Sequence, residues 1–115
     1  NRAGLHALAE SLSPHMKSES IVVFGVMKDK EYQAMCEIIA SMGMTIIAVH
    51  PKGSRALKAS QIAFWVNSCG GKATNGGSVR NGILAAKKLA GSKGRILVTG
   101  SHYVVGEAME FLLKN

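Results

Sequence analysis

The sequence of 115 residues has few cysteines, few aromatic residues and no long apolar run. Cys36 and Cys69 form no Cys-x-x-Cys pair and no histidine cluster accompanies them, which argues against a zinc site and a disulfide framework. We expect both to be reduced thiols in the core of a cytoplasmic protein. No apolar run approaches the roughly 18 residues of a membrane-spanning helix, so no membrane segment is expected. The few aromatic residues are not interleaved with basic ones, which argues against nucleic acid as the partner.

The residues that are present are those of a folded domain. With 47% hydrophobic and 18% charged residues the chain is too apolar for intrinsic disorder, and its length suits one domain over residues 1–115. The net charge of +7 favours an anionic partner, a class that includes nucleic acid, nucleotide phosphates and polycarboxylates. The sequence begins at Asn1 rather than Met and shows no signal peptide, and we expect it to be a fragment of a larger protein.

Segments rich in Val and Ile alternate along the chain with segments of helical period. Strands are expected at residues 21–24, 45–49 and 95–99, with a weaker one around 72–74. Helices are expected at residues 2–12, 30–41, 57–68, 78–90 and 104–113. This order predicts an α/β domain of Rossmann-like, three-layer type, with a mostly parallel sheet and helices on both faces.

Local signals refine the expected helices. Asp29 and Ser78 precede two of them and are typical N-caps. The apolar stripe of the helix at 57–68 includes Phe64, and that of the last helix includes Met109 and Leu112. Met109 is one of six methionines whose helical spacing is typical of core filling.

Parallel sheets of this type bind ligands at the carboxyl ends of their strands, which directs attention to the residues after Phe24, Val49 and Thr99. After the last strand, the hydroxyls of Ser101 and Tyr103 and the free N–H groups of the following helix suit a carboxylate or a phosphate. The alternative is that Ser101 only caps that helix and that Tyr103 is a half-buried packing residue.

Other motifs in the sequence give weaker evidence for a functional site. Residues 71–78 resemble a phosphate-binding loop, but Gly77 stands where that loop needs its lysine, which favours a turn and a Ser-capped helix. Asp29 and Lys30 follow the first strand and suit an anion contact, or equally a helix cap and a solvated lysine. His50 has no evident carboxylate or metal partner, and we assign no general base and no metal site.

Three segments together resemble a known family. Residues 1–8, Asn-Arg-Ala-Gly-Leu-His-Ala-Leu, look like the continuation of an Asp-Gly-Ala-His-Asn-Pro motif from its Asn. Residues 23–30, Val-Phe-Gly-Val-Met-Lys-Asp-Lys, are similar to that family's first strand and Asp-Lys loop. Residues 96–107 match its Thr-Gly-Ser-x-Tyr-x-Val-Gly-Glu signature, and Arg55-Ala56-Leu57 also has a counterpart. The chain resembles the C-terminal domain of folylpolyglutamate synthase/dihydrofolate synthase, within the Mur ligase superfamily.

The resemblance implies a ligase that uses ATP and Mg²⁺ to join L-glutamate to folate or dihydropteroate through an acyl phosphate. It implies that Ser101 and Tyr103 contact glutamate and that Asp29, Lys30 and Asn1 are possible substrate or phosphate contacts. The ATPase domain with its phosphate loop would precede this chain, so the chain alone would be inactive and holds no catalytic residue. Alternatives are a peptidoglycan-type Mur ligase domain, and a non-enzymatic module that binds nucleotide or nucleic acid.

Overall fold

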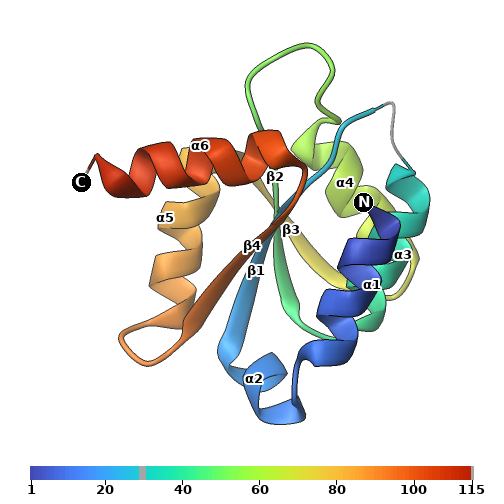
Figure 1. Cartoon of the computed structure of the whole chain (residues 1–115), viewed down its shortest axis with the longest axis vertical. Helices are drawn as coiled ribbons and strands as arrows, with labels where there is room; N and C mark the ends of the chain where they lie inside the picture. Colours follow the sequence, from blue (N-terminus) through green and yellow to red (C-terminus); the bar gives the residue numbers. More distant parts are fainter. Residues whose placement is uncertain (29–30, 115) are drawn as a thin grey trace.

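The computed structural model describes residues 1–28 and 31–114, in which strands and helices alternate as the sequence pattern predicts (Figure 1). The strands are β1 (Ser20–Gly25), β2 (Thr45–His50), β3 (Lys72–Ser78) and β4 (Arg95–Gly100). The helices are α1 (Arg2–Ser11), α2 (Pro14–Glu19), α3 (Tyr32–Ser41), α4 (Ala59–Ser68), α5 (Val79–Ala90) and α6 (His102–Leu113). The four strands pair in parallel in the order β3-β2-β1-β4.

Helices cover both faces of the sheet because successive side chains of a strand point to opposite faces (Figure 1). In β1, Val22 and Phe24 join the core formed with α1, α3 and α4, whereas Val23 joins the core formed with α5 and α6. In β2, Ile46 and Ile47 divide in the same way. Strands buried on both sides need continuous apolar runs, which is why these two strands were evident in the sequence. The predicted three-layer α/β fold is confirmed.

β3 is longer than the strand expected around residues 72–74, since it runs over Lys72–Ser78. Its polar and glycine-rich sequence shows no apolar alternation, and pairing with β2 is what makes it a strand. The register with β2 shifts once, at a β-bulge that leaves Ser78 opposite His50. Residues 72–78 therefore form a strand rather than the expected turn, but Ser78 caps α5 as predicted, by accepting from the N–H of Asn81 at 3.1 Å.

α3 begins at Tyr32, later than expected for the helix at 30–41. Its N-cap is Glu31, whose side chain makes no capping hydrogen bond. The predicted cap, Asp29, lies outside the described residues, as does Lys30.

Two further helix boundaries differ from expectation. α4 begins at Ala59 rather than Leu57, because the N–H of Leu57 donates to the carbonyl of Val26 at 3.0 Å and holds this segment in extended form. α2 was not expected, although Ser13 caps it by accepting from the N–H of Met16 at 3.1 Å and a proline stands in its first turn. Its shortness concealed the pattern.

The apolar stripes are narrower than the sequence suggests. In α4, Ile62 and Val66 are buried but Phe64 is 64% exposed, so only part of the apolar pattern of this helix lies in the core. In α6, Met109 and Leu112 are exposed, and Met109 is not the core-filling residue that its spacing predicts. Figure 1 shows the C-terminal part of α6 extending past the sheet toward α5, and α6 packs against the core on this face through Val104, Ala108 and Phe111 instead.

The two cysteines occupy different environments. Both are free thiols, as expected, and Cys36 is fully buried in α3. Cys69 is exposed at the end of α4, so its assignment to the core is wrong. Burial, together with the nearby Cys69, raises the pKa of the Cys36 thiol from 9.0 to about 12, which keeps it protonated at neutral pH.

Candidate functional site

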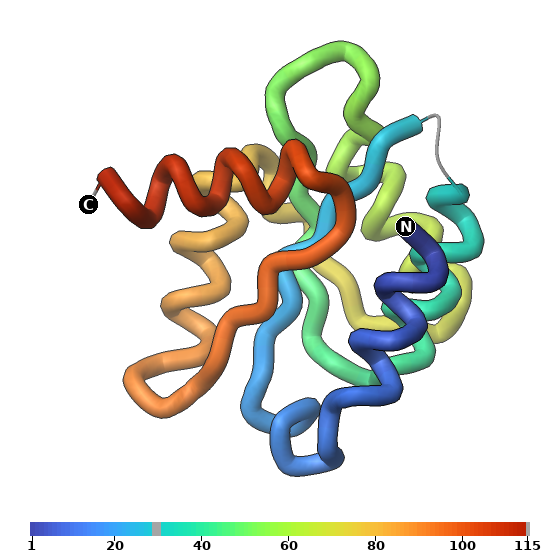
Figure 2. The backbone as a smooth tube through the Cα atoms, in the orientation of Figure 1, coloured from blue at the N-terminus to red at the C-terminus, as the bar shows by residue number. Residues whose placement is uncertain are grey.

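The carboxyl ends of β1 and β4 form the switch point of the sheet, where the direction of winding reverses. β1 and β4 are neighbours, but the chain leaves β1 toward α3 on one face and leaves β4 toward α6 on the other. The two connections diverge, and open parallel sheets bind ligands in the crevice that such a divergence creates. Figure 2 shows that the start of α1 also approaches the turn between β4 and α6.

Two glycines allow the strand ends to meet closely at this point. Gly25 and Gly100 are register partners, and the N–H of Ser101 donates to the carbonyl of Gly25 at 2.9 Å. Gly100 has φ +120°, and a Cβ there would lie 1.9 Å from the Gly25 oxygen. A side chain at Gly25 would in turn collide with the carbonyl of Val49 and a methyl group of Val104. Only glycine at both positions lets the backbone turn sharply into α6.

Between the diverging connections lies a hollow of about 260 Å³, which we call the switch-point cavity. Its polar wall is the turn from Gly100 to Tyr103, and Asn1 closes it on the side of α1. Its apolar wall consists of Val26, Met27 and Met35, all buried.

The apolar wall is held in place by a short pairing between the segment after β1 and the segment before α4. Met27 and Ala56 form an isolated antiparallel bridge. The N–H of Lys28 donates to the carbonyl of Arg55 at 2.8 Å, beside the hydrogen bond from Leu57 to Val26. The Arg-Ala-Leu segment singled out in the sequence therefore supports the cavity from behind.

Three of the sequence-predicted site residues meet at this cavity. Ser101 caps α6, since its Oγ accepts from the N–H of Val104 at 3.2 Å. Asn1 caps α1, with its Oδ1 accepting from the N–H of Gly4 at 2.7 Å. Tyr103 is 58% exposed, so it is not the half-buried packing residue of the alternative interpretation. The other two candidates, Asp29 and Lys30, lie outside the described residues.

The cavity offers donors on one side and apolar atoms on the other. The first N–H groups of α6 have no partner within the helix and point toward its N-terminus, where the helix dipole favours an anion. The hydroxyl hydrogens of Ser101 and Tyr103 add donors. Such a wall suits a carboxylate, while Val26, Met27 and Met35 suit the methylene groups of a short aliphatic chain.

A second hollow, of about 710 Å³, lies along α6 beyond its first turn, and sequence reasoning missed it. We call it the α6 groove; its walls come from four separate segments, so no single motif marked it. They are the loop 50–53, the turn into α5 at residues 78–80, the outer side of α6, and Lys114. Its lining residues are His50, Pro51, Lys52, Gly53, Ser78, Arg80, Glu107, Glu110, Phe111 and Lys114.

Hydrogen bonds order the walls of the α6 groove. Glu107 accepts from the backbone N–H of Lys52 at 2.6 Å, which joins α6 to the loop after β2. Glu110 accepts from Lys114 Nζ at 3.0 Å, and this bond, with the charges of Lys114 and Lys52, holds the pKa of Glu110 below its usual value. The partner of His50 is a backbone group, since its Nδ1 accepts from the N–H of Ala59 at 3.1 Å.

Neither a metal centre nor a membrane segment is found in residues 1–28 and 31–114. No three His, Cys, Asp or Glu side chains in these ranges come together as metal ligands. No helix within them combines the length and apolarity needed to cross a bilayer.

Comparison with solved structures places this geometry in a known fold. Folylpolyglutamate synthase of Mycobacterium tuberculosis in complex with ADP matches with a TM-score of 0.79 and 21% identity, over 100% of this chain. E. coli FolC in complex with DHPP and ADP matches with a TM-score of 0.82 and 21% identity, over 99% of it. The bifunctional folylpolyglutamate synthase/dihydrofolate synthase of Yersinia pestis matches with a TM-score of 0.83 and 20% identity, over 98%. The chain has the fold of a Mur ligase C-terminal domain.

The chain spans only 27–28% of the length of those three proteins. No protein-family profile matches the sequence, and no curated protein matches it. The fold is therefore established by structural comparison, whereas the sequence resemblance rests on short motifs.

Proposed function

We propose that the chain is the C-terminal domain of an ATP-dependent ligase that attaches L-glutamate to folate or dihydropteroate. The observation that carries this proposal is the meeting of Asn1, Ser101 and Tyr103 at the switch-point cavity, because the sequence resemblance assigns these same residues to substrate contacts. The structural likeness to proteins named folylpolyglutamate synthase supports it, as does the binding of ADP and DHPP by E. coli FolC.

In the proposed reaction, the γ-phosphoryl group of ATP passes to a carboxylate oxygen of folate or dihydropteroate, which gives an acyl phosphate and ADP. The amine of L-glutamate then attacks the acyl carbon, phosphate leaves, and the nitrogen loses a proton as the amide forms. ATP and Mg²⁺ are bound mainly by a separate ATPase domain of the same cytoplasmic enzyme, where the metal neutralises phosphate charge. The described residues of this chain include no cluster that would hold the metal.

The role of this domain is to hold the incoming glutamate and to close over the ATPase domain. Ser101, Tyr103 and the first N–H groups of α6 donate to a glutamate carboxylate. The apolar wall of the cavity contacts the methylene groups. Holding the amine in place converts a bimolecular step into an intramolecular one, which is the domain's contribution to the rate.

The test is ATP-dependent transfer of radiolabelled L-glutamate to dihydropteroate and to tetrahydrofolate by the intact enzyme that contains this domain. We expect Ser101→Ala to raise the glutamate KM about tenfold and Tyr103→Phe about fivefold, because each removes a donor to a charged group. Ser13→Ala is the matched control for Ser101→Ala, since it also removes a serine N-cap but lies in α2, outside the cavity. Tyr32→Phe is the control for Tyr103→Phe.

The outcomes separate the parts of the proposal. Transfer by the wild type with an unchanged glutamate KM in both cavity variants would contradict the glutamate site while the ligase assignment stands. Transfer to neither acceptor would contradict the folate assignment. In that case a panel of peptidoglycan precursors and amino acids, and the salt dependence of oligonucleotide binding, would test the alternatives.

A further inference from the structure

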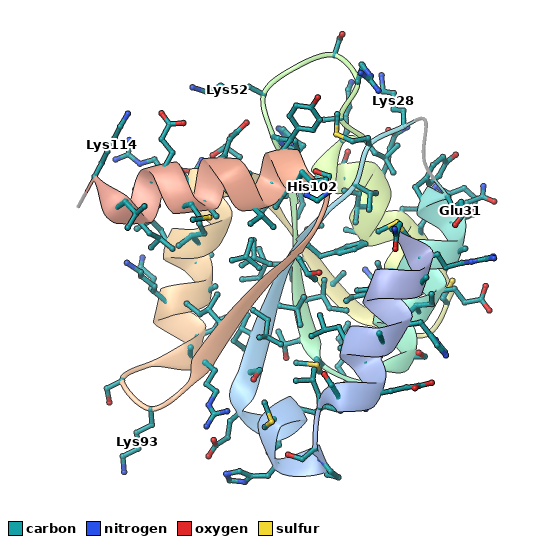
Figure 3. All side chains as sticks on the ribbon, viewed as in Figure 1. Lys28, Glu31, Lys52, Lys93, His102 and Lys114 are labelled. Atoms are coloured by element: carbon teal, nitrogen blue, oxygen red, sulfur yellow. The ribbon has the colours of Figure 1, made fainter. Side chains whose placement is uncertain are left out.

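The α6 groove has no part in the reaction described above, and its walls differ in chemistry from those of the switch-point cavity. Three cationic side chains line it, Lys52, Arg80 and Lys114, and each comes from a different segment. No Lys or Arg among the described residues lines the switch-point cavity. Figure 3 shows Lys52 and Lys114 projecting on the same side of α6, from the loop after β2 and from the helix end.

Two of these cations are free to bind a ligand. Lys114 is paired with Glu110, but among the described residues no carboxylate lies within ion-pair distance of the side chains of Lys52 and Arg80. The Arg80 guanidinium lies over the ring of Phe111, 5.7 Å from its centre. Stacking on this ring orients the guanidinium without consuming its N–H donors.

Neutral donors stand at the inner end of the groove. Because His50 Nδ1 accepts from the N–H of Ala59, the neutral ring carries its proton on Nε2. The β-bulge in β3 leaves Ser78 opposite His50 in the register with β2, and both residues line the groove. Bulges beside binding sites commonly serve to re-aim a side chain in this way.

The acidic residues limit the kind of anion that fits. Glu107 and Glu110 lie one turn apart on α6, among the three cations, so charges of both signs are spaced along the groove. A compact phosphate group prefers clustered donors and is repelled by nearby carboxylates. An extended ligand with spaced carboxylates fits this arrangement better. Its carboxylates pair with the cations, and its N–H groups donate to Glu107 and Glu110. Its methylene groups contact Pro51 and Phe111.

A chain of γ-linked glutamate residues has this combination of spaced carboxylates, amide N–H groups and methylene groups. We propose that the α6 groove binds the γ-glutamyl tail of a substrate that already carries several glutamates, with Arg80 and Lys52 as its carboxylate anchors. This inference rests on the proposed function. It adds a second site to the domain, which shares no lining residue with the site of the incoming glutamate.

The test uses the intact enzyme and compares acceptor folates with one and with three glutamates. We expect Arg80→Gln and Lys52→Gln each to raise the KM of the triglutamate acceptor about tenfold, while the KM values of the monoglutamate acceptor, ATP and free L-glutamate change less than about twofold. Arg95→Gln is the matched control: it removes the same charged group from an exposed position at the opposite edge of the sheet. It should leave every KM unchanged.

Several results would overturn the tail site. One is an equal KM change for the monoglutamate and triglutamate acceptors, and another is an equal effect of Arg95→Gln, which would reveal only a loss of net charge. A rise in the ATP KM of the Arg80 variant would mark the groove as a phosphate site instead. All of these leave glutamate transfer by the wild type intact, whereas failure of the proposed function abolishes transfer by every form of the enzyme.

Discussion

At the scale of single residues, the two glycines at the switch point determine whether the site exists. Gly100 combines a left-handed φ with an approach to the Gly25 carbonyl that leaves no space for a Cβ. The hydrogen bond from Ser101 to Gly25 depends on that approach, and Ser101 begins the turn that forms the polar wall of the cavity. The sequence marks these positions only as glycines after strands.

Gly100→Ala is predicted to lower the free energy of unfolding by more than about 3 kcal/mol, from backbone strain and from the collision with Gly25. Gly53→Ala provides the comparison, because Gly53 has a similar φ of +114° but no atom within 4 Å of a built Cβ. Gly53→Ala should lower the free energy of unfolding only by the cost of backbone strain, about 1–2 kcal/mol. Urea denaturation of both variants measures the difference, and equal losses would contradict the close approach.

The cysteines lead to a second prediction at this scale. Burial raises the pKa of Cys36 to about 12, above its unfolded value of 9.0, so protonated Cys36 stabilises the fold below pH 9 and this contribution is lost as the pH rises toward 12. We expect iodoacetamide to modify exposed Cys69 in the native protein at pH 8, and Cys36 only after unfolding. Mass spectrometry of the alkylated peptides identifies which cysteine was modified. Equal modification of both would show that Cys36 is accessible.

At the scale of elements, α4 shows the difference between apolar residues that are buried and apolar residues that only match the helical pattern. Ile62→Ala is predicted to destabilise the protein by about 2–4 kcal/mol, because it opens a cavity in the core beneath the helix. Phe64→Ala should cost less than about 1 kcal/mol, since Phe64 is exposed and its ring lies edge-on to that of Trp65. Thermal denaturation compares the two, and a larger loss for Phe64 would contradict the orientation of α4.

The same elements show how far sequence reasoning reaches. β1 and β2 were predictable because burial on both faces demands continuous apolar runs, and the Ser78 and Ser101 caps because their hydroxyls act locally. β3 was only partly predictable, because its partner strand, not its own side chains, makes it extended. The outward direction of Phe64 depends on which side of α4 meets the sheet, which is a tertiary property.

The switch-point cavity was more predictable from the sequence than the α6 groove. The sequence motifs named Asn1, Ser101 and Tyr103, and the rule for carboxyl ends of parallel strands accounts for Ser101 and Tyr103 at the cavity. The place of Asn1 there depends on the packing of α1, which is a tertiary property. The α6 groove assembles Lys52, Arg80 and Lys114 from distant segments, so no local pattern reveals it. Such a groove can be recognised only once the position of α6 relative to the sheet is known.

At the scale of the whole molecule, the proposed function makes this chain one side of a larger catalytic site. It spans 27–28% of the proteins whose structures it resembles, and its described residues hold no metal cluster. We therefore predict that the 115-residue chain alone neither hydrolyses ATP nor transfers glutamate, even at millimolar substrate. Release of labelled phosphate and incorporation of labelled glutamate measure this. Turnover by the isolated chain would contradict the division of roles proposed here.

The pairing of β1 with β4 also affects how the molecule folds. β1 and β2 lie close in the sequence, whereas Gly25 must find Gly100 from near the other end of the chain, and closing so long a loop costs entropy that is recovered late. The switch-point cavity is therefore complete only when the last strand docks. A ligand in that cavity contacts the ends of the first and last strands of the sequence, so it binds the complete fold in preference to a partly folded one. It is therefore expected to slow unfolding more than it speeds folding.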